Sequence, residues 1–203
     1  MAKEKIGNLL GLAVLALLRE RPTHPYEIST LMRERGLSGS IKLNFGSLYA
    51  VIEGLRAKGL IAVRGTEREG NHPERTIYEV TETGVSELLG RLRRLVGTPT
   101  KEYSHFAAGL TFLAQLEPSE VLGLLGDRAR SLEAAALELE GILDRTQKSG
   151  VDRLFLIEIE YALAIQRAEL EWVHAAARSI SEGELAAMAA GSLRWKALMS
   201  AKG

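Results

Sequence analysis

The stretch from Asn44 to Lys58, NFGSLYAVIEGLRAK, constrains this chain more than any other part of it. At about 100° per residue, a helix over this stretch has two unlike faces. One face is an apolar stripe that has to be buried: Phe45, Leu48, Val51, Ile52 and Leu55. The other face consists of small residues, with Glu53 at its edge: Gly46, Ser47, Ala50, Gly54 and Ala57.

The small-residue face admits two interpretations. A solvated helix face is usually built from good helix formers such as Lys and Glu, whereas glycines lower helix stability. A thin face instead lets the helix approach another surface closely. Lys42 precedes the stretch, and Arg56 and Lys58 lie in its last turn, which suits a helix in the DNA major groove with cations reaching phosphates. The alternative is that Ala and Gly pack against another protein helix, and this stretch alone does not decide between them.

Composition bounds the fold and the location. The 203 residues suffice for one large domain or two small ones, and the absence of cysteine excludes disulfides and thiolate metal sites. Residues 1–97 hold 15 basic and 11 acidic side chains, against 11 and 15 in residues 98–203, which favours a polyanion-facing front half. The apolar run Leu9 to Leu18 is too short to span a bilayer, and no signal-peptide layout follows it. We therefore expect a cytoplasmic protein without a membrane partner.

Two helices precede the opening stretch. Ile6 to Glu20 is apolar on most of its circumference, which predicts a buried central helix. Pro25 suits the first position of a second helix, with His24 as its cap and Gly36 as its stop. Asn44 is the expected N-cap of the third helix.

After the third helix the pattern changes to that of strands. Leu60 to Arg64 and Thr76 to Val80 are predicted to form a hairpin around the polar segment GTEREGNHPE. Three helices followed by such a hairpin make a winged helix-turn-helix, in which the third helix reads a groove and the wing touches the backbone beside it.

Three segments of the front half resemble bacterial transcriptional regulators of the PadR family. They are HPYEI at 24–28, FGSLYAVIEGLRAKGLI at 45–61 and RTIYEVTETGVSELL at 75–89. In that family the first motif usually has glycine where Pro25 stands, and the third helix usually has threonine where Ser47 stands. The resemblance implies DNA binding and repression that is relieved by a small molecule, often a phenolic or other aromatic compound.

The back half is predicted to be helical. A linking helix over Thr81 to Val96 ends at Gly97, which gives a domain boundary between 1–97 and 98–203. Long helices are expected over Pro118 to Lys148 and Val151 to Ser179, followed by one over Glu182 to Met199. The predicted fold is thus mainly α, with a winged helix-turn-helix followed by an all-α domain of long antiparallel helices.

The long helices have more apolar surface than a small domain can bury, which predicts a homodimer. Heptad-like steps along the first of them indicate a coiled-coil-like seam. Residues 160–172 also resemble the dimerisation region of longer PadR-family members. The predicted dimerisation residues are Leu125, Leu132, Leu139, Leu154, Tyr161 and Trp172.

No catalytic, metal or cofactor signature occurs. The four histidines are scattered, and no nucleophile elbow or glycine-rich phosphate loop is present, so we expect no enzyme, cofactor or metal site. Trp172 is more typical of a core or interface anchor, but an aromatic side chain in a helical dimer is also a candidate for lining an effector cavity.

The sequence therefore predicts a homodimeric transcription factor for double-stranded, pseudo-palindromic DNA, with a small-molecule effector as its input. Ser47 is the candidate for a base contact. The alternative is a winged helix that binds protein and not DNA. The backbone contacts are expected from Lys42, Asn44, Tyr49, Lys58, Arg64, Arg68 and Arg75.

Overall fold

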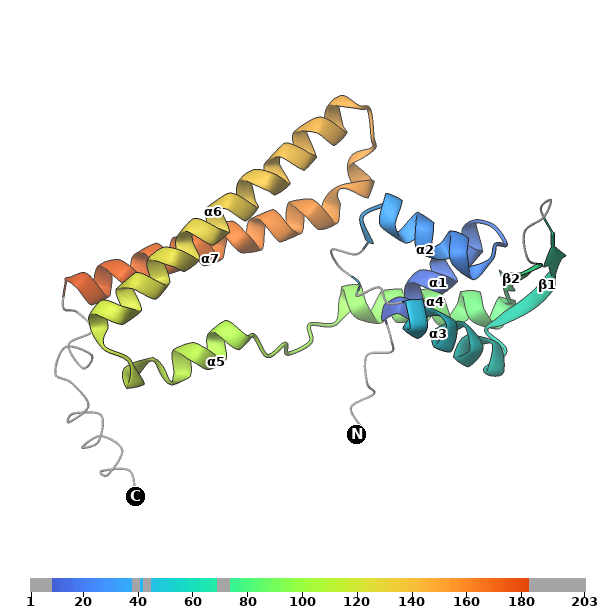
Figure 1. Cartoon of the computed structure of the whole chain (residues 1–203), viewed down its shortest axis with the longest axis horizontal. Coiled ribbons are helices and arrows are strands. Elements are labelled where there is room, and N and C mark those ends of the chain that lie inside the picture. The colour runs from blue at the N-terminus through green and yellow to red at the C-terminus, as the bar shows by residue number, and fades with distance from the viewer. Residues whose placement is uncertain (1–8, 38–40, 42–44, 69–73, 183–203) are drawn as a thin grey trace, which may run out of the picture. The chain divides into compact units, whose positions relative to one another are not determined.

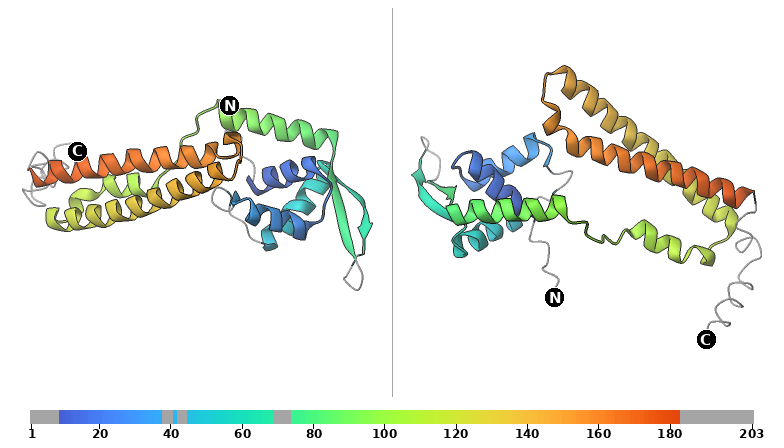
Figure 2. Two further views of the ribbon diagram at one scale, coloured as in Figure 1. Left: turned by 90° about the horizontal axis from the view of Figure 1, so that it is seen from above. Right: turned by 180° about the vertical axis from the view of Figure 1, so that it is seen from behind.

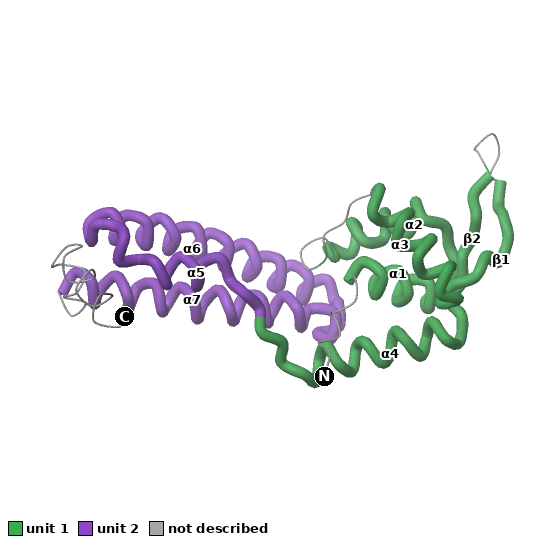
Figure 3. The backbone as a smooth tube through the Cα atoms, turned by 90° about the horizontal axis from the view of Figure 1, so that it is seen from below, with its two compact units in different colours: residues 1–101 green, residues 102–203 purple. Residues whose placement is uncertain are grey.

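The computed structural model describes residues 9–37, 41, 45–68 and 74–182. The chain divides into two compact units, residues 1–101 and 102–203, which are described separately below (Figure 3). No helix among the described residues is both long enough and apolar enough to cross a bilayer.

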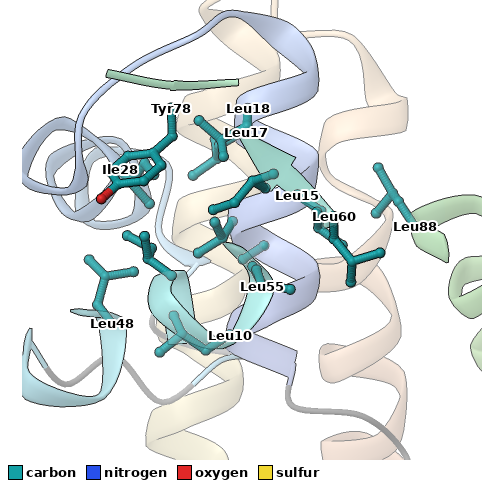
Figure 4. Packing of buried hydrophobic residues seen from close by; sticks show 14 of the residues in the cluster. Leu10, Leu15, Leu17, Leu18, Ile28, Leu48, Leu55, Leu60, Tyr78 and Leu88 are labelled. Carbon is teal, nitrogen blue, oxygen red and sulfur yellow. The ribbon is translucent and has the colours of Figure 1, made fainter. Parts of the chain in front are cut away.

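Unit 1 is built around one buried helix. Helix α1 (Leu9–Glu20) contacts α2 (Pro25–Glu34), α3 (Phe45–Ala57), strand β2 (Arg75–Val80) and α4 (Glu82–Gly97). Its side chains Val14 and Leu15 are completely buried, as the apolar circumference predicts. Figure 4 shows the leucines of α1 among Ile28, Leu48, Leu55 and Leu88 from the surrounding helices.

The two strands form the predicted wing. Strand β1 (Ile61–Glu67) pairs antiparallel with β2, and both extend beyond the predicted bounds toward the tip (Figures 1 and 2). The pairing register shifts between Val63 and Gly65, so Arg64 is the extra residue of a β-bulge. A bulge re-aims the side chain that it carries.

Local signals fix where the unit 1 helices begin and end. His24 caps α2 as predicted, because its Nδ1 accepts the Glu27 N–H at 3.2 Å, and Gly36 after α2 has a φ of 68°. The Thr81 hydroxyl accepts the Gly84 N–H at 3.0 Å and so caps α4. The expected cap Asn44 lies outside the described residues.

Unit 2 is a helical hairpin with a short helix packed on it. Helix α6 (Pro118–Lys148) lies antiparallel to α7 (Ile157–Ser181), and the two contact each other along their lengths (Figure 1). Helix α5 (His105–Thr111) and a following 3-10 turn place Phe106 and Leu113 against the core of the hairpin. That core is formed by Val121, Leu125, Ala129, Val173 and Ile180.

The second long helix starts later than its periodicity predicts. The prediction was a helix from Val151, but Gly150 has a φ of 77°, and the Asp152 carboxylate accepts the Leu154 N–H at 2.8 Å. This bond caps a 3-10 turn over Arg153–Phe155, and α7 begins after it. The helix predicted over Glu182 to Met199 lies beyond the described residues except for its first position.

Candidate nucleic-acid interface

The small-residue face of α3 is exposed, as the DNA-binding interpretation requires. Leu48, Ile52 and Leu55 are at most 6% exposed and fix the orientation of the helix in unit 1. The small residues on the opposite side are all exposed: Gly46, Ser47, Ala50, Gly54 and Ala57. A Cβ added at Gly54 would meet no atom within 4 Å, so no group among the described residues covers that part of the helix. Packing against another helix of the described chain therefore does not explain the glycine.

Polar and cationic side chains flank this face. Tyr49 is 55% exposed, and Lys58 follows the helix on the surface. Arg56 pairs with Glu53 at 2.8 Å, with both side chains more than half exposed. Such an exposed pair contributes little stability, so Arg56 can exchange its carboxylate for another anion at small cost. The predicted contacts Lys42 and Asn44 lie outside the described residues.

The wing carries three arginines. Arg64 occupies the bulge of β1, and Arg68 follows the end of the same strand, with both side chains exposed. Arg75 begins β2 opposite Glu67 and is half-buried. These three positions agree with a cationic wing, although residues 69–73 between the strands lie outside the description.

A groove joins the wing to the start of α2. Thr23 forms a two-bond β-bridge with Tyr78, with N···O distances of 3.1 and 2.9 Å, which holds the beginning of α2 against β2. The groove, called the α2–wing groove below, has a volume of about 620 Å³. Its lining combines the first turns of α2 with the tip-side ends of the strands: His24, Tyr26, Glu27, Thr30, Glu67, Arg68 and Arg75.

Aromatic and cationic groups meet in this groove. The rings of His24 and Tyr26 stack with centroids 6.3 Å apart, and the Arg75 guanidinium carbon lies 5.9 Å from the Tyr26 ring centroid. Sequence reasoning placed Arg75 among the DNA contacts and His24 as a helix cap or core residue. It assigned Tyr26 to the core face of α2, which is wrong, because this side chain is 58% exposed. His24 lies close to Arg75 because Thr23 forms a β-bridge with Tyr78, and no local sequence pattern predicts this bridge.

The Glu27 carboxylate, at the edge of the groove, accepts hydrogen bonds that make the stability of the fold depend on pH. Hydrogen bonds from the Thr23 hydroxyl and, to a lesser degree, from Arg21 lower the pKa of Glu27 below its ordinary value of 4.5, although burial opposes the shift. A lowered pKa in the folded state stabilises the fold above pH 4.5, and this contribution is lost as the pH falls through the folded-state value. We expect Glu27→Gln to reduce the loss of thermal stability between pH 6 and pH 3, measured by circular dichroism. An acid-side slope identical to that of the wild type would contradict this assignment.

The predicted dimerisation residues lie in two environments in unit 2. Leu125 is 4% exposed, and Leu132 packs against the same cluster, so both belong to the core of one subunit. Leu139 on α6 is half-buried. Leu154 and Tyr161 are 69% and 68% exposed and face outward.

Trp172 stands at the edge of an aromatic and ionic cluster. It is 47% exposed and makes an edge-to-face contact with Phe106, with ring centroids 5.8 Å apart. The Arg128 guanidinium lies 3.6 Å from the Phe106 ring centroid, and its Nε donates to Glu169 at 2.6 Å. In the described residues no group of three or more metal-binding side chains could hold a metal ion.

Comparisons with known proteins agree with this arrangement. Residues 14–89 match the model of the transcriptional regulator PadR-like family. Bacillus subtilis PadR in complex with operator DNA superposes with a TM-score of 0.69 at 22% identity, covering 85% of this chain and 99% of that one. The same protein in complex with p-coumaric acid gives a TM-score of 0.72 at 20% identity with the same coverage.

A regulator from another genus has the same architecture. The Vibrio cholerae virulence activator AphA gives a TM-score of 0.62 at 15% identity, over 85% of this chain and 98% of that one. At these identities the likeness establishes the fold. A sequence comparison with curated proteins finds no significant match. The family match runs from Val14 within α1 to Leu89, halfway along α4, so residues 14–89 form a domain of the transcriptional regulator PadR-like family.

Proposed function

We propose that this regulator is a homodimer that binds double-stranded DNA by inserting α3 of each subunit into a major groove. The observation that carries the proposal is the exposed small-residue face of α3, from Gly46 to Ala57, on which a Cβ added at Gly54 would meet no described atom within 4 Å. Ser47 is the candidate for a base contact, since serine can donate or accept. With few long polar side chains on this face, sequence-dependent DNA shape would supply much of the specificity.

The wing arginines are assigned to the DNA backbone in this proposal. We expect Arg64→Ala with Arg68→Ala to weaken binding by at least about tenfold on all sequences, because phosphate contacts position the protein without reading bases. The slope of log K against log salt should fall by about 1.8, because each lost phosphate contact removes about 0.9. Fluorescence anisotropy at several salt concentrations measures both quantities. An unchanged slope would show that the two wing arginines do not contact the DNA backbone.

The experiment that tests the function itself is a mobility-shift assay of the full chain on the DNA upstream of its own gene, at several salt concentrations. The complex of Bacillus subtilis PadR with operator DNA supports DNA as the partner. Absence of a shift in dilute buffer would favour the second candidate, in which the winged helix binds protein and α6 with α7 serves as an assembly arm. A cytoplasmic location follows from a role on the chromosome.

Dimerisation is assigned to an outward apolar stripe of α7. Ile157, Tyr161, Ile165 and Trp172 fall within about 80° of one another at 100° per residue, and they are between 47% and 68% exposed. On the other side of α7, Leu163 and Val173 are buried, and α7 contacts α6 along its length. A helix that is apolar on two opposite sides needs two partners, and a second copy of the chain is the partner that gives twofold symmetry.

A charge in the centre of the stripe tests this assignment. We expect Tyr161→Glu to weaken the dimer by at least about 100-fold in sedimentation equilibrium, since an unpaired carboxylate would be buried between subunits. Gln147→Glu adds the same charge on the surface of α6, and this variant should still sediment with the mass of a dimer. If the Tyr161→Glu variant stays dimeric, the dimer interface does not include this stripe of α7.

An effector is the remaining part of the proposal. The complex of Bacillus subtilis PadR with p-coumaric acid supports a small aromatic acid as its class. In unit 2 Trp172, beside Phe106 and Arg128, is the candidate contact, because the cluster combines aromatic edges with a cation. Quenching of tryptophan fluorescence by p-coumaric acid that is lost in Trp172→Phe would support this assignment, and quenching that persists would move the site.

A further inference from the structure

Two hydrogen-bond donors, on His24 and Arg75, lie next to each other in the α2–wing groove. His24 Nδ1 accepts the Glu27 N–H and therefore carries no proton, so the neutral ring carries its proton on Nε2. Arg75 Nη1, which is also a donor, lies 3.4 Å from this nitrogen. In this tautomer the contact cannot be a hydrogen bond, because neither atom has a lone pair to offer.

The opposite tautomer would remove one bond to make the other. If Nε2 accepted from Arg75, the proton would sit on Nδ1 and face the Glu27 N–H, so the cap of α2 would be lost. An N-cap is worth about 1 kcal/mol, and the first-turn amides have no other intrahelical acceptor. The cap therefore selects the arrangement with two donors at one place.

No acceptor in the described part of the chain satisfies this pair. Two carboxylates line the groove. That of Glu27 is already occupied by the Thr23 hydroxyl and by Arg21, and that of Glu67, which lies opposite Arg75 in the wing, forms no hydrogen bond or ion pair with Arg75 in the described chain. The ring of Tyr26 lies beside both His24 and Arg75. An oxygen atom placed between His24 Nε2 and Arg75 Nη1 would accept from both, and an anionic oxygen would also neutralise the guanidinium.

We infer that His24 Nε2 and Arg75 together bind a phosphate oxygen of the DNA backbone in the α2–wing groove, which makes α2 part of the DNA-contacting surface. The inference rests on the proposed DNA binding. A duplex is the favoured source of the phosphate because the groove is open, with a volume of about 620 Å³, and continuous with the cationic wing at Arg68. His24 then has two roles, as the cap of α2 and as a phosphate ligand.

The two roles of His24 are separable by substitution. His24→Asn keeps a good N-cap but removes the Nε2 donor, so the unfolding temperature should stay near that of the wild type. Duplex affinity should fall about 5- to 20-fold with an unchanged salt slope, because a neutral donor is lost. Arg75→Gln should lower the salt slope by about 0.9, and Arg75→Lys should restore the slope. Arg130→Gln, an exposed arginine of unit 2, is the control and should bind as the wild type does.

The measurement is anisotropy of a labelled duplex from the promoter with the full chain, together with calorimetric titration of inorganic phosphate. Weaker binding by His24→Asn with a reduced slope for Arg75→Gln would support the site. Wild-type affinity in His24→Asn, or an unchanged slope in Arg75→Gln, would overturn it. Saturable binding of inorganic phosphate that His24→Asn abolishes without affecting the duplex would also overturn it, in favour of a free anion. A wild-type chain that binds no duplex would instead refute the proposed function.

Discussion

Replacing Gly84 by alanine is expected to destabilise unit 1 by about 4 kcal/mol or more. A Cβ at this position would lie 2.0 Å from the Leu60 carbonyl oxygen and 2.8 Å from a methyl carbon of Val80. The same Leu60 oxygen accepts the Thr81 N–H at 3.1 Å. Displacing this oxygen would break the hydrogen bond that connects the start of α4 to the beginning of the wing. Overpacking usually costs about 1–3 kcal/mol, but here the obstacle is backbone that cannot rotate aside.

Gly90 provides the matched control on the same helix. A Cβ there would have the Arg94 guanidinium at 3.7 Å as its nearest contact, which is an ordinary van der Waals distance. Gly90→Ala should therefore stabilise the chain by up to about 1 kcal/mol, because alanine loses less backbone entropy on forming a helix. Urea denaturation followed by circular dichroism measures both variants. Equal midpoints for the two would contradict the close approach of α4 to Leu60.

Local sequence signals predict the architecture of unit 1 well. The apolar circumference of α1, the His24 cap, the alternation in the strands and the small face of α3 each depend on residues within one element. These signals are strong because α1 has to be buried on nearly every side and because Gly and Pro mark the helix ends. The family resemblance then joins the elements into a winged helix, which the match to residues 14–89 confirms.

The features that the sequence leaves open depend on long-range contacts. The α2–wing groove requires Thr23 to pair with Tyr78, and the proximity of His24 to Arg75 follows only from that bridge. On α6, the heptad-like steps indicate an apolar seam but not its partner. In the structure the seam at Leu125 packs on α7 of the same chain, and the outer stripe of α7 is left exposed.

The largest functional effect is expected at Ala50, in the middle of the exposed face of α3. Ala50→Glu places a carboxylate where the proposal puts the major groove, so steric overlap and repulsion by phosphates act together. We expect duplex affinity to fall by at least about 100-fold, or roughly 2.7 kcal/mol. Stability should change by no more than about 0.5 kcal/mol, because the side chain is exposed and glutamate is a good helix former.

Two further variants separate a DNA-binding face from a merely exposed one. Ala134→Glu adds the same charge to an exposed position of α6 and should leave duplex affinity within about twofold, since it lies outside the proposed interface. Gly54→Ala adds only a methyl group in open space on α3 and should raise stability by up to about 1 kcal/mol. If the added Cβ also lowers duplex affinity, the DNA major groove must approach the helix backbone at Gly54. The glycine would then be required for DNA binding and not for folding. Ala50→Glu binding the duplex as tightly as Ala134→Glu would show that α3 does not enter the groove.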